Sequence, residues 1–384
     1  MTPQARLQAA IELVDEIIAS ARAGGAAADT LIARYFKTRR YAGSKDRRAV
    51  RELVFRAVRR AGETPVSGRA ALLGLEDLRE LFDGAPHGPA PVAEGEPVAE
   101  AGIAPAWLLE RFDPQIGAGE LAALLARAPL DVRINRLKPA PGGLQAGPTP
   151  HSPTGLRFPE GTRVEQLDAW ASGQIEVQDE GSQLICLACG AAPAMLAIDL
   201  CAGAGGKTLA LAAEMQNDGS LIAADTDRAR LSRLAPRAER AGVTIVEARL
   251  LDPGREAAAL ADIAGKADLV LVDAPCSGTG TWRRNPETRW RVNEQRLAQL
   301  TALQARLLDL AGTLLKPGGI LVYAVCSLLA EEGRDQAAAF TARSGLPPET
   351  VVMKAGRAAG TGILLSPGHD GTDGFFVARW RAPC

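Results

Sequence analysis

The chain has 384 residues, of which 23% are charged, and its formal net charge is −1. This length allows two or three domains with buried cores, and the balanced charge gives no reason to expect a disordered chain. An apolar run of about 18 residues, as needed to cross a membrane, does not occur, and the amino end begins an amphipathic stretch instead of a signal peptide. The six cysteines lack paired spacing, which predicts reduced thiols in a cytoplasmic protein. Cys186-Leu-Ala-Cys189 has the spacing of a redox or metal site, but no second pair lies nearby, so we expect a structural role there and no metal.

Positive charge is concentrated near the amino end. Eleven Lys and Arg residues lie between Arg34 and Arg60 against two acidic residues, whereas the segment 76–120 contains ten acidic residues and two arginines. A cluster of positive charges in a nearly neutral protein is typical of a surface that binds a polyanion. A solvated helix face is the alternative, but the length of the run favours nucleic acid.

Three segments precede the region that carries the chemistry. Residues 1–82 are predicted to form a helical domain, because apolar residues recur at helical spacing, and one helix is expected to start with Ser44 as its cap. Residues 83–105 are rich in Pro, Gly, Ala and Glu and are predicted to be a linker. Residues 106–173 mix short helical and strand patterns and are predicted to be a small α+β module.

Residues 174–384 alternate between strand and helix patterns, which predicts an α/β domain with a parallel sheet and right-handed crossovers. The expected strands are Ala197–Leu200, Leu221–Ala224, Thr244–Glu247, Leu269–Val272, Ile320–Val325 and Gly374–Trp380. The expected helices are Lys207–Met215, Arg228–Arg240, Arg255–Ile263, Asn293–Leu315 and Glu331–Ser344.

A glycine-rich turn follows the first of these strands, with the sequence Asp199-Leu-Cys-Ala-Gly-Ala-Gly-Gly-Lys-Thr208. Glycines let a ligand approach the backbone, and free amides at a helix start favour polar or anionic groups. The spacing matches neither a P-loop nor a dinucleotide fingerprint. Asp225 ends the next strand, where a carboxylate can accept both ribose hydroxyls of an adenosine. We therefore expect a nucleotide-like cofactor here, with a plain tight turn as the alternative.

Two cysteines follow two further strands. Asp273-Ala-Pro-Cys276 comes after one apolar run and Cys326-Ser327 after another, so both thiols are expected at one edge of the sheet. A thiolate that adds to C6 of a cytosine makes C5 nucleophilic enough to take a methyl group, and a carboxylate such as Asp273 can bond the N3 and amino edge of the ring. The basic loop after Cys276 contains Trp282 and Trp290, for which base stacking and packing under the loop are equally consistent interpretations.

Residues 170–384 resemble the RsmB/Sun-type (NOL1/NOP2/Sun) RNA cytosine-C5 methyltransferases. The glycine-rich turn is similar to the cofactor motif of that family, and Asp-Ala-Pro-Cys-Ser-Gly-Thr-Gly and Val-Tyr-Ala-Val-Cys-Ser are similar to its two cysteine motifs. Arg-Arg-Asn-Pro-Glu-Thr-Arg-Trp and Asp-Gly-Phe-Phe-Val-Ala-Arg-Trp380 also resemble family segments. The helical amino-terminal segment resembles the NusB-like RNA-binding domain of the bacterial rRNA members.

The resemblance implies a Rossmann-like S-adenosyl-L-methionine-dependent methyltransferase domain, preceded by a NusB-like domain and the small α+β module. It implies Cys326 as the nucleophile, Cys276 as the thiol that assists release of the methylated RNA, and Asp273 as a contact to cofactor and base. The residues implied in cofactor binding are Cys201, Ala202, Gly203, Ala204, Gly205, Gly206, Lys207, Asp225, Asp252 and Asp273.

The chain departs from the family pattern at three places. Gly203-Ala204 replaces the usual Ala-Pro, and Ala330 and Gly333 replace a common Pro and Asn. The family usually has Gly-Asp after its third strand to face the adenine, whereas this chain has Ala248-Arg249, with Asp252 three residues later. Asp252 is expected to take that role after a small shift of the loop.

The expected activity is methylation of cytosine C5 in RNA, and the expected substrate is 16S (small-subunit) rRNA. The protein is expected to be a monomer. Three alternatives stay open. The first is a tRNA or another RNA as substrate. The second is a DNA cytosine-C5 methyltransferase, in which Cys276 would be the nucleophile. The third is an RNA-binding ribosome assembly factor that has lost catalysis.

Overall fold

The computed structural model describes all residues from Met1 to Cys384, and the chain divides into two compact units. A helical unit contains Met1–Arg127 and Ser277–Leu297, and a sheet unit contains Ala128–Cys276 and Ala298–Cys384. These boundaries differ from those expected from the sequence. The segment 83–105, interpreted as a linker, and the segment 106–127, assigned to the α+β module, both belong to the helical unit. The short segment after Cys276 also belongs there, although it is far away in the sequence.

The helical unit packs its helices around one apolar core. Its α-helices are α1 (Pro3–Arg22), α2 (Ala28–Thr38), α3 (Ser44–Arg60), α4 (Gly68–Leu73), α5 (Ala106–Leu109) and α6 (Ala118–Ala123). Its 3-10 helices are η1 (Glu76–Leu81), η4 (Thr279–Thr281) and η5 (Pro286–Trp290). Apolar residues at helical spacing, such as Leu7, Ile11 and Ile18, are buried in this core, as the periodicity predicted. No helix of the chain is long and apolar enough to cross a membrane.

The cap of α3 lies one residue earlier than expected. Gly43 is the N-cap, and Ser44 is already the first helical residue. The carboxylate of Asp46 accepts the backbone N–H of Gly43 at 3.1 Å, so the first turn is closed by an acidic side chain instead of the serine hydroxyl.

The sheet unit begins with a small antiparallel module. Its strands pair in the order β2-β3-β1-β4. The strands are β1 (Leu130–Ile134), β2 (Gly147–Pro148), β3 (Gly155–Phe158) and β4 (Ile175–Val177), and they are accompanied by η2 (Val164–Gln166) and α7 (Asp168–Ala171). Val132, Phe158 and Ile175 are buried in a separate small core. The α+β composition expected for this stretch is therefore present from residue 128 onward.

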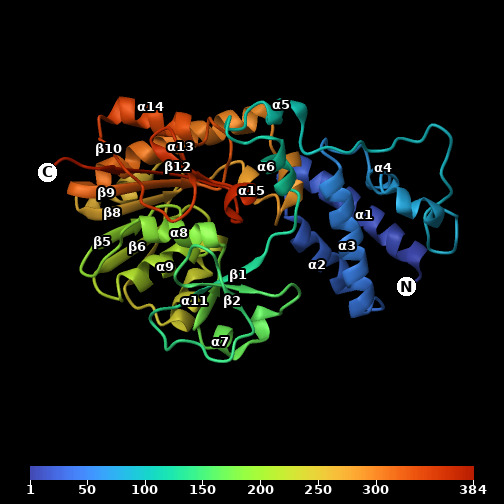
Figure 1. The fold of residues 1–384 in the computed structure, drawn as a ribbon, viewed down its shortest axis with the longest axis horizontal. Helices are drawn as coiled ribbons and strands as arrows, with labels where there is room; N and C mark the ends of the chain where they lie inside the picture. Colours follow the sequence, from blue (N-terminus) through green and yellow to red (C-terminus); the bar gives the residue numbers. More distant parts are fainter. The chain divides into compact units, whose positions relative to one another are not determined.

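The main sheet has nine strands, eight of them in the order β11-β12-β13-β9-β8-β5-β6-β7. The central strands are β5 (Leu196–Asp199), β6 (Ser220–Asp225), β7 (Val246–Leu250), β8 (Ala267–Asp273) and β9 (Leu315–Val325). The helices are α8 (Glu180–Ala188), α9 (Gly206–Glu214), α10 (Arg228–Leu231), α11 (Leu234–Ala241), α12 (Glu256–Ala259), η3 (Ala261–Ile263), α13 (Glu294–Leu314) and α14 (Arg334–Ser344). The first residues of α13 belong to the helical unit. Within this unit α8, α9 and α11 cover one face of the sheet, and α13 and α14 cover the other (Figure 1). The carboxyl ends of β5, β6, β8 and β9 therefore share one edge.

The expectation of an entirely parallel sheet was wrong for the last strands. β5 to β9 pair in parallel, but β13 (Phe375–Arg381) pairs antiparallel with β9 and with β12 (Gly362–Leu365). The remaining strands are β10 (Pro348–Glu349) and β11 (Arg357–Ala359), and α15 (Pro367–Asp370) lies between β12 and β13. The connection from β12 to β13, residues 366–374, is short, and a connection of this length returns the chain antiparallel, because a parallel return needs a longer crossover.

Candidate active site

The glycine-rich turn joins β5 to α9, and its backbone is tightly folded. Gly203 and Gly205 have φ angles of +55° and +85°, and the N–H of Gly205 donates to the Ala202 carbonyl at 2.9 Å. A side chain at Gly203 would meet the guanidinium of Arg230, whereas one at Gly206 would meet nothing within 4 Å. The turn therefore requires glycine for its conformation and leaves open space at the first residue of α9. Free amides at this helix start can donate to a ligand.

Asp225 lies at the end of β6, beside the turn. Its Oδ2 accepts the N–H of Gly203 and its Oδ1 accepts the N–H of Asp227, both at 2.7 Å, and the residue is 8% exposed. Each carboxylate oxygen keeps a further lone pair that can accept a hydroxyl. The same side chain thus holds the turn in shape and presents acceptors beside it.

Lys207 and Asp273 connect the cofactor turn with the first cysteine segment. The ammonium of Lys207 donates to Oδ2 of Asp273 at 2.7 Å. Burial acts to lower the pKa of Lys207, but the neighbouring Asp273 carboxylate outweighs it, so this pKa lies above its ordinary value. Two residues predicted from separate motifs therefore form one ion pair at the carboxyl ends of β5 and β8.

Asp199 lies beneath the turn and was not among the predicted site residues. It is fully buried, its Oδ2 accepts the Thr208 hydroxyl at 2.7 Å, and its Oδ1 has no hydrogen-bond partner. Burial raises the pKa of Asp199 to about 7, against the effect of the Thr208 hydrogen bond. With glycine amides, open space at Gly206 and acceptors on Asp225, these residues fit a cofactor that carries ribose hydroxyls and an amino-acid group.

Asp252 and Arg249 follow the third strand of the parallel series, β7. Asp252 is exposed. The guanidinium of Arg249 donates hydrogen bonds to the carboxylates of Glu247 at 2.6 Å and of Asp262 at 2.7 Å. Arg249 is thus held by acidic neighbours on its own side of the strand. The role expected for Asp252 toward an adenine stays a prediction.

Cys276 and Cys326 come together in the structure. Their sulfur atoms are 3.4 Å apart, both are free thiols, and both are partly exposed. At this distance one thiol can donate a hydrogen bond to the other, which stabilises a thiolate on the acceptor. Cys186 and Cys189 are buried, and burial raises the pKa values of their thiols, which makes them poor nucleophiles.

A buried polar bridge that the sequence did not reveal supports both cysteine segments. Gln304 on α13 donates to the carbonyl of Pro275 at 2.9 Å and to Oε1 of Glu332 at 3.0 Å. Glu332 is fully buried, and its Oε2 accepts the hydroxyl of Ser327 at 2.6 Å. Pro275 precedes Cys276 and Ser327 follows Cys326, so one bridge holds the neighbours of both thiols. The helix expected at Glu331–Ser344 would have included Glu332, but α14 begins two residues after it, at Arg334.

The tryptophans of the loop after Cys276 are packed. Trp282 is 0% exposed and Trp290 is 6% exposed, and Trp282 contacts Phe112 edge to face with ring centroids 5.6 Å apart. Of the two interpretations drawn from the sequence, packing under the loop is the one that the structure supports.

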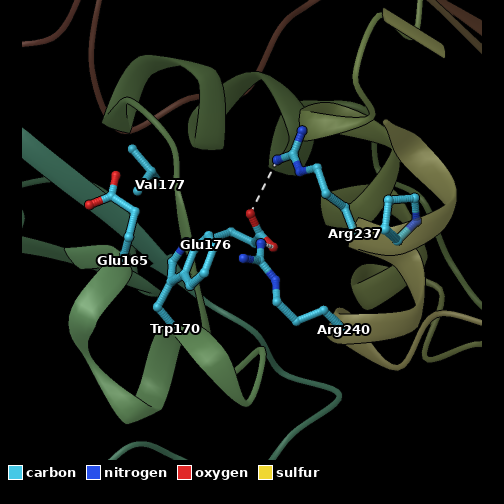
Figure 2. A pocket seen from close by; sticks show the side chains of 7 residues that line it. Glu165, Trp170, Glu176, Val177, Arg237 and Arg240 are labelled. Atoms are coloured by element: carbon cyan, nitrogen blue, oxygen red, sulfur yellow. Dashed lines mark hydrogen bonds and ion pairs between the residues drawn. The ribbon is translucent and has the colours of Figure 1, made fainter. Parts of the chain in front are cut away.

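A cleft of about 470 Å³ lies beside α11 but contains none of the predicted site residues. Figure 2 shows Arg237 and Arg240 of α11 turned toward Glu176 of β4, with the guanidinium of Arg240 3.9 Å from the ring centre of Trp170. Arg237 donates to Glu176 at 3.1 Å and to the carbonyl of Ala204 at 2.6 Å. The antiparallel module thus braces the glycine-rich turn through Arg237, which sequence patterns did not indicate.

Comparison with known proteins adds independent information on this sheet unit. Residues 190–381 match the family described as 16S rRNA methyltransferase RsmB/F. Curated relatives named ribosomal RNA small subunit methyltransferase B from Salmonella typhi and Salmonella newport are each 33% identical, over 287 and 289 residues. These matches cover 72% of this chain and 65% of each relative, so the chain spans just under two thirds of their length.

Solved structures share the fold. The protein PH0851 superposes with a TM-score of 0.78 at 24% identity and covers 99% of both chains. A methyltransferase homolog from Pyrococcus horikoshii gives 0.62 at 27% identity, covering 72% of this chain and 94% of its own. NSun6 from Pyrococcus horikoshii, solved with SFG, gives 0.64 at 20% identity, covering 72% of this chain and 96% of its own. The predicted Rossmann-like fold of S-adenosyl-methionine-dependent methyltransferases is confirmed. The sequence motifs, the fold and the family match agree, and the chain therefore belongs to the 16S rRNA methyltransferase RsmB/F family.

Proposed function

We propose that this protein methylates C5 of a cytosine in small-subunit rRNA, with S-adenosyl-L-methionine as donor and a covalent bond between Cys326 and C6 of the base. The observation that carries the proposal is the 3.4 Å separation of the Cys276 and Cys326 sulfur atoms at the strand edge. A single thiol at this edge could act only as a nucleophile. Two thiols in contact suit a reaction that has both an addition step and an elimination step. Because the bacterial relatives act on ribosomal RNA by name, we also propose a cytoplasmic protein.

The chain supplies the groups for each step. The thiolate of Cys326 forms a bond to C6, the electron pair of the C5=C6 bond moves to C4–C5, and the pair of the C4=N3 bond moves to N3. N3 is neutralised by a proton that it shares with Asp273. S-adenosyl-methionine, when bound, would supply the methyl group to C5, with its carbon–sulfur bond breaking and S-adenosylhomocysteine leaving. A base then removes the C5 proton, the electron pair re-forms the C5=C6 bond, and the sulfur of Cys326 leaves. Cys276, in contact with that sulfur, assists the elimination through its thiol proton.

Cofactor binding is assigned to the glycine-rich turn. In the proposal the backbone from Cys201 to Lys207 faces the cofactor, Asp225 accepts the ribose hydroxyls, and Asp252 faces the adenine. The support is the close packing of Gly203 and Gly205, the open space at Gly206, and the carboxylate oxygens of Asp225.

RNA binding is assigned to a basic cluster around the turn between α2 and α3. Its members are exposed cations of the helical unit: Arg34, Lys37, Arg40, Lys45, Arg47 and Arg48. Arg51, in the same sequence run, is instead paired with Asp29 at 2.7 Å. Tyr41 lies within the cluster and is 72% exposed, which is typical of an aromatic that stacks on an unpaired base.

Reversing the charge of Lys37, Arg40 and Arg48 to glutamate is expected to weaken RNA binding and reduce its dependence on salt. Each lost phosphate contact removes about 0.7 to 0.9 from the magnitude of the slope of log K against log salt, so the loss of three contacts should reduce it by about 2 to 3. Titration of an rRNA fragment at several salt concentrations measures this. The matched control reverses three exposed cations of the sheet unit, Arg233, Arg255 and Lys354. Equal slopes for the wild type and the cluster variant would make the basic cluster an ordinary solvated surface.

The proposed reaction is tested directly on RNA. Small-subunit rRNA from cells that lack the gene is incubated with the protein and S-adenosyl-methionine, and bisulfite sequencing then locates 5-methylcytosine. We expect one protected cytosine that is absent without the cofactor. A protected cytosine only in tRNA would mean that tRNA, and not small-subunit rRNA, is the substrate. Cofactor binding without methylation of any RNA would favour the assembly-factor alternative.

A further inference from the structure

The peptide group that joins Ala204 to Gly205 lies in the middle of the glycine-rich turn. It is flanked by Gly203 and Gly205, whose φ angles are +55° and +85°. Glycine has access to more backbone conformations than any other residue, so a turn with glycines on both sides depends on contacts to keep one shape. The N–H of Gly205 donates to the Ala202 carbonyl at 2.9 Å, which holds one end of this peptide group.

A side chain from another element holds the other end. The guanidinium of Arg237, on α11, donates to the carbonyl of Ala204 at 2.6 Å. Because a peptide group is planar, the Ala204 carbonyl and the Gly205 N–H cannot rotate independently. Arg237 and Ala202 therefore fix the orientation of one plane from its two ends. The next residue, Gly206, starts α9 and has open space beside it.

Helix α11 also packs directly against the turn. A side chain added at Gly205 would collide with Leu234, which is 1% exposed. Leu234 and Arg237 are three residues apart, so they lie on the same face of the helix. An apolar contact and a hydrogen bond from one helix face thus reach the same turn, and both elements belong to the sheet unit.

Arg237 is itself held in position by the antiparallel module. It donates to Oε2 of Glu176, on β4, at 3.1 Å, and Glu176 is 4% exposed. The second carboxylate oxygen of Glu176 pairs with Arg240, whose guanidinium lies 3.9 Å from the ring centre of Trp170 (Figure 2). A buried carboxylate with two guanidinium partners is well satisfied and has little freedom to move. The guanidinium of Arg237 is therefore ordered from the side opposite the turn.

Order in the turn matters for binding, because a ligand that must order a mobile loop loses part of its affinity to that ordering. We propose that Arg237, held by Glu176, is a positioning residue for S-adenosyl-methionine: it fixes the peptide group between Ala204 and Gly205 and so raises the affinity of the turn. This rests on the proposed cofactor site. The antiparallel module then contributes to cofactor affinity through one side chain, although it supplies none of the residues assigned to the cofactor.

The test measures cofactor affinity by calorimetric titration in Arg237→Met, Glu176→Gln and the double variant. Methionine keeps the apolar stem of Arg237 but cannot donate to the Ala204 carbonyl. We expect the dissociation constant to rise about tenfold in Arg237→Met, which is the contribution of one hydrogen bond from a charged group. In Glu176→Gln we expect a smaller rise of about threefold, because an amide oxygen still accepts a weaker hydrogen bond from Arg237. The double variant should match Arg237→Met, because Glu176 acts on the turn through Arg237.

Two further measurements separate positioning from general stability. Arg136→Met removes another ion pair of the sheet unit, with Glu214 at 3.3 Å, and is the matched control. Its dissociation constant should equal that of the wild type. In Arg237→Met the KM for S-adenosyl-methionine should rise about tenfold, while kcat at saturating cofactor should stay that of the wild type. A merely structural loss would instead lower kcat and leave KM unchanged, which would overturn the inference.

The outcomes distinguish this inference from the proposed cofactor site. If Asp225→Ala weakens binding and Arg237→Met leaves it unchanged, only the inference fails. If both variants bind as the wild type does, the turn is not the cofactor site and both proposals fail. A double variant that is weaker than Arg237→Met by the full factor of Glu176→Gln would overturn the role of Glu176 in holding Arg237. Should Arg237→Met not fold, Glu176→Gln carries the test, and a wild-type dissociation constant in that variant overturns the inference.

Discussion

Replacing Cys326 with alanine is expected to abolish methyl transfer and the covalent protein–RNA complex together, because no other group takes over the attack on C6. Replacing Cys276 with alanine should still allow attack and methylation but slow the elimination, so that a denaturant-resistant complex accumulates. The reason is that addition and elimination move different protons, and in the proposed mechanism each of the two touching thiols serves one of them. A gel under denaturing conditions, run with a cytosine-containing rRNA fragment and labelled cofactor, measures both effects.

The exposed Cys384 provides the control for this pair. Cys384→Ala removes a thiol without touching the strand edge and should behave as the wild type. A trapped complex in Cys326→Ala, with none in Cys276→Ala, would reverse the assignment and give the order expected of a DNA cytosine-C5 methyltransferase.

Replacing Asp225 with alanine is expected to weaken S-adenosyl-methionine binding at least tenfold. Hydrogen bonds to a charged group contribute about 1.5–3 kcal/mol, and a factor of ten in affinity corresponds to about 1.4 kcal/mol. The variant also releases the N–H groups of Gly203 and Asp227, each bound at 2.7 Å, so the turn itself loses two supports. Calorimetric titration with the cofactor gives the dissociation constant.

Asp252→Ala is the companion variant for this titration, because Asp252 is exposed and is proposed to face the adenine. We expect a smaller loss than for Asp225→Ala. An unchanged dissociation constant in Asp225→Ala would remove that residue from the cofactor site, and an unchanged value in Asp252→Ala would do the same for Asp252.

The parts of the fold that the sequence predicted well are those with strong local patterns. β5, β6 and β8 lie within one or two residues of the expected ranges, because strands buried on both faces have continuous apolar sequences. β7 was expected at 244–247 but spans Val246–Leu250, because it lies at the edge of the sheet and is only partly buried, which weakens its pattern. The direction of β13 could not be predicted, because strand direction depends on pairing partners distant in the sequence.

In the candidate site, too, the residues marked by a local pattern could be predicted and those that depend on distant partners could not. The glycine-rich turn, Asp225, Asp273 and both cysteines could be selected because motif spacing and strand ends mark them locally. Gln304 and Glu332 could not, since each acts through a partner on another element. Arg289 binds the Val58 carbonyl across 231 residues of sequence, and no local pattern encodes such a contact. Residues whose role depends on a partner on another element are therefore hidden from the sequence more often than residues marked by a local motif.

The split of the helical unit between residues 1–127 and 277–297 determines how the gene can be recombined. Arg289 donates to the carbonyls of Val58, Arg59 and Ala61 at the end of α3, and Glu287 accepts the N–H of Ala28 at the start of α2. A chimera that exchanges only the first 127 residues with a relative would pair these side chains with foreign helix ends, and a cut at residue 128 would expose Trp282 and Trp290. Exchanging both stretches together preserves these contacts. Chimeras within this family should therefore be built as two-segment transplants, and sequence changes in α3 and in the segment around Arg289 should be accepted by evolution only as matched sets.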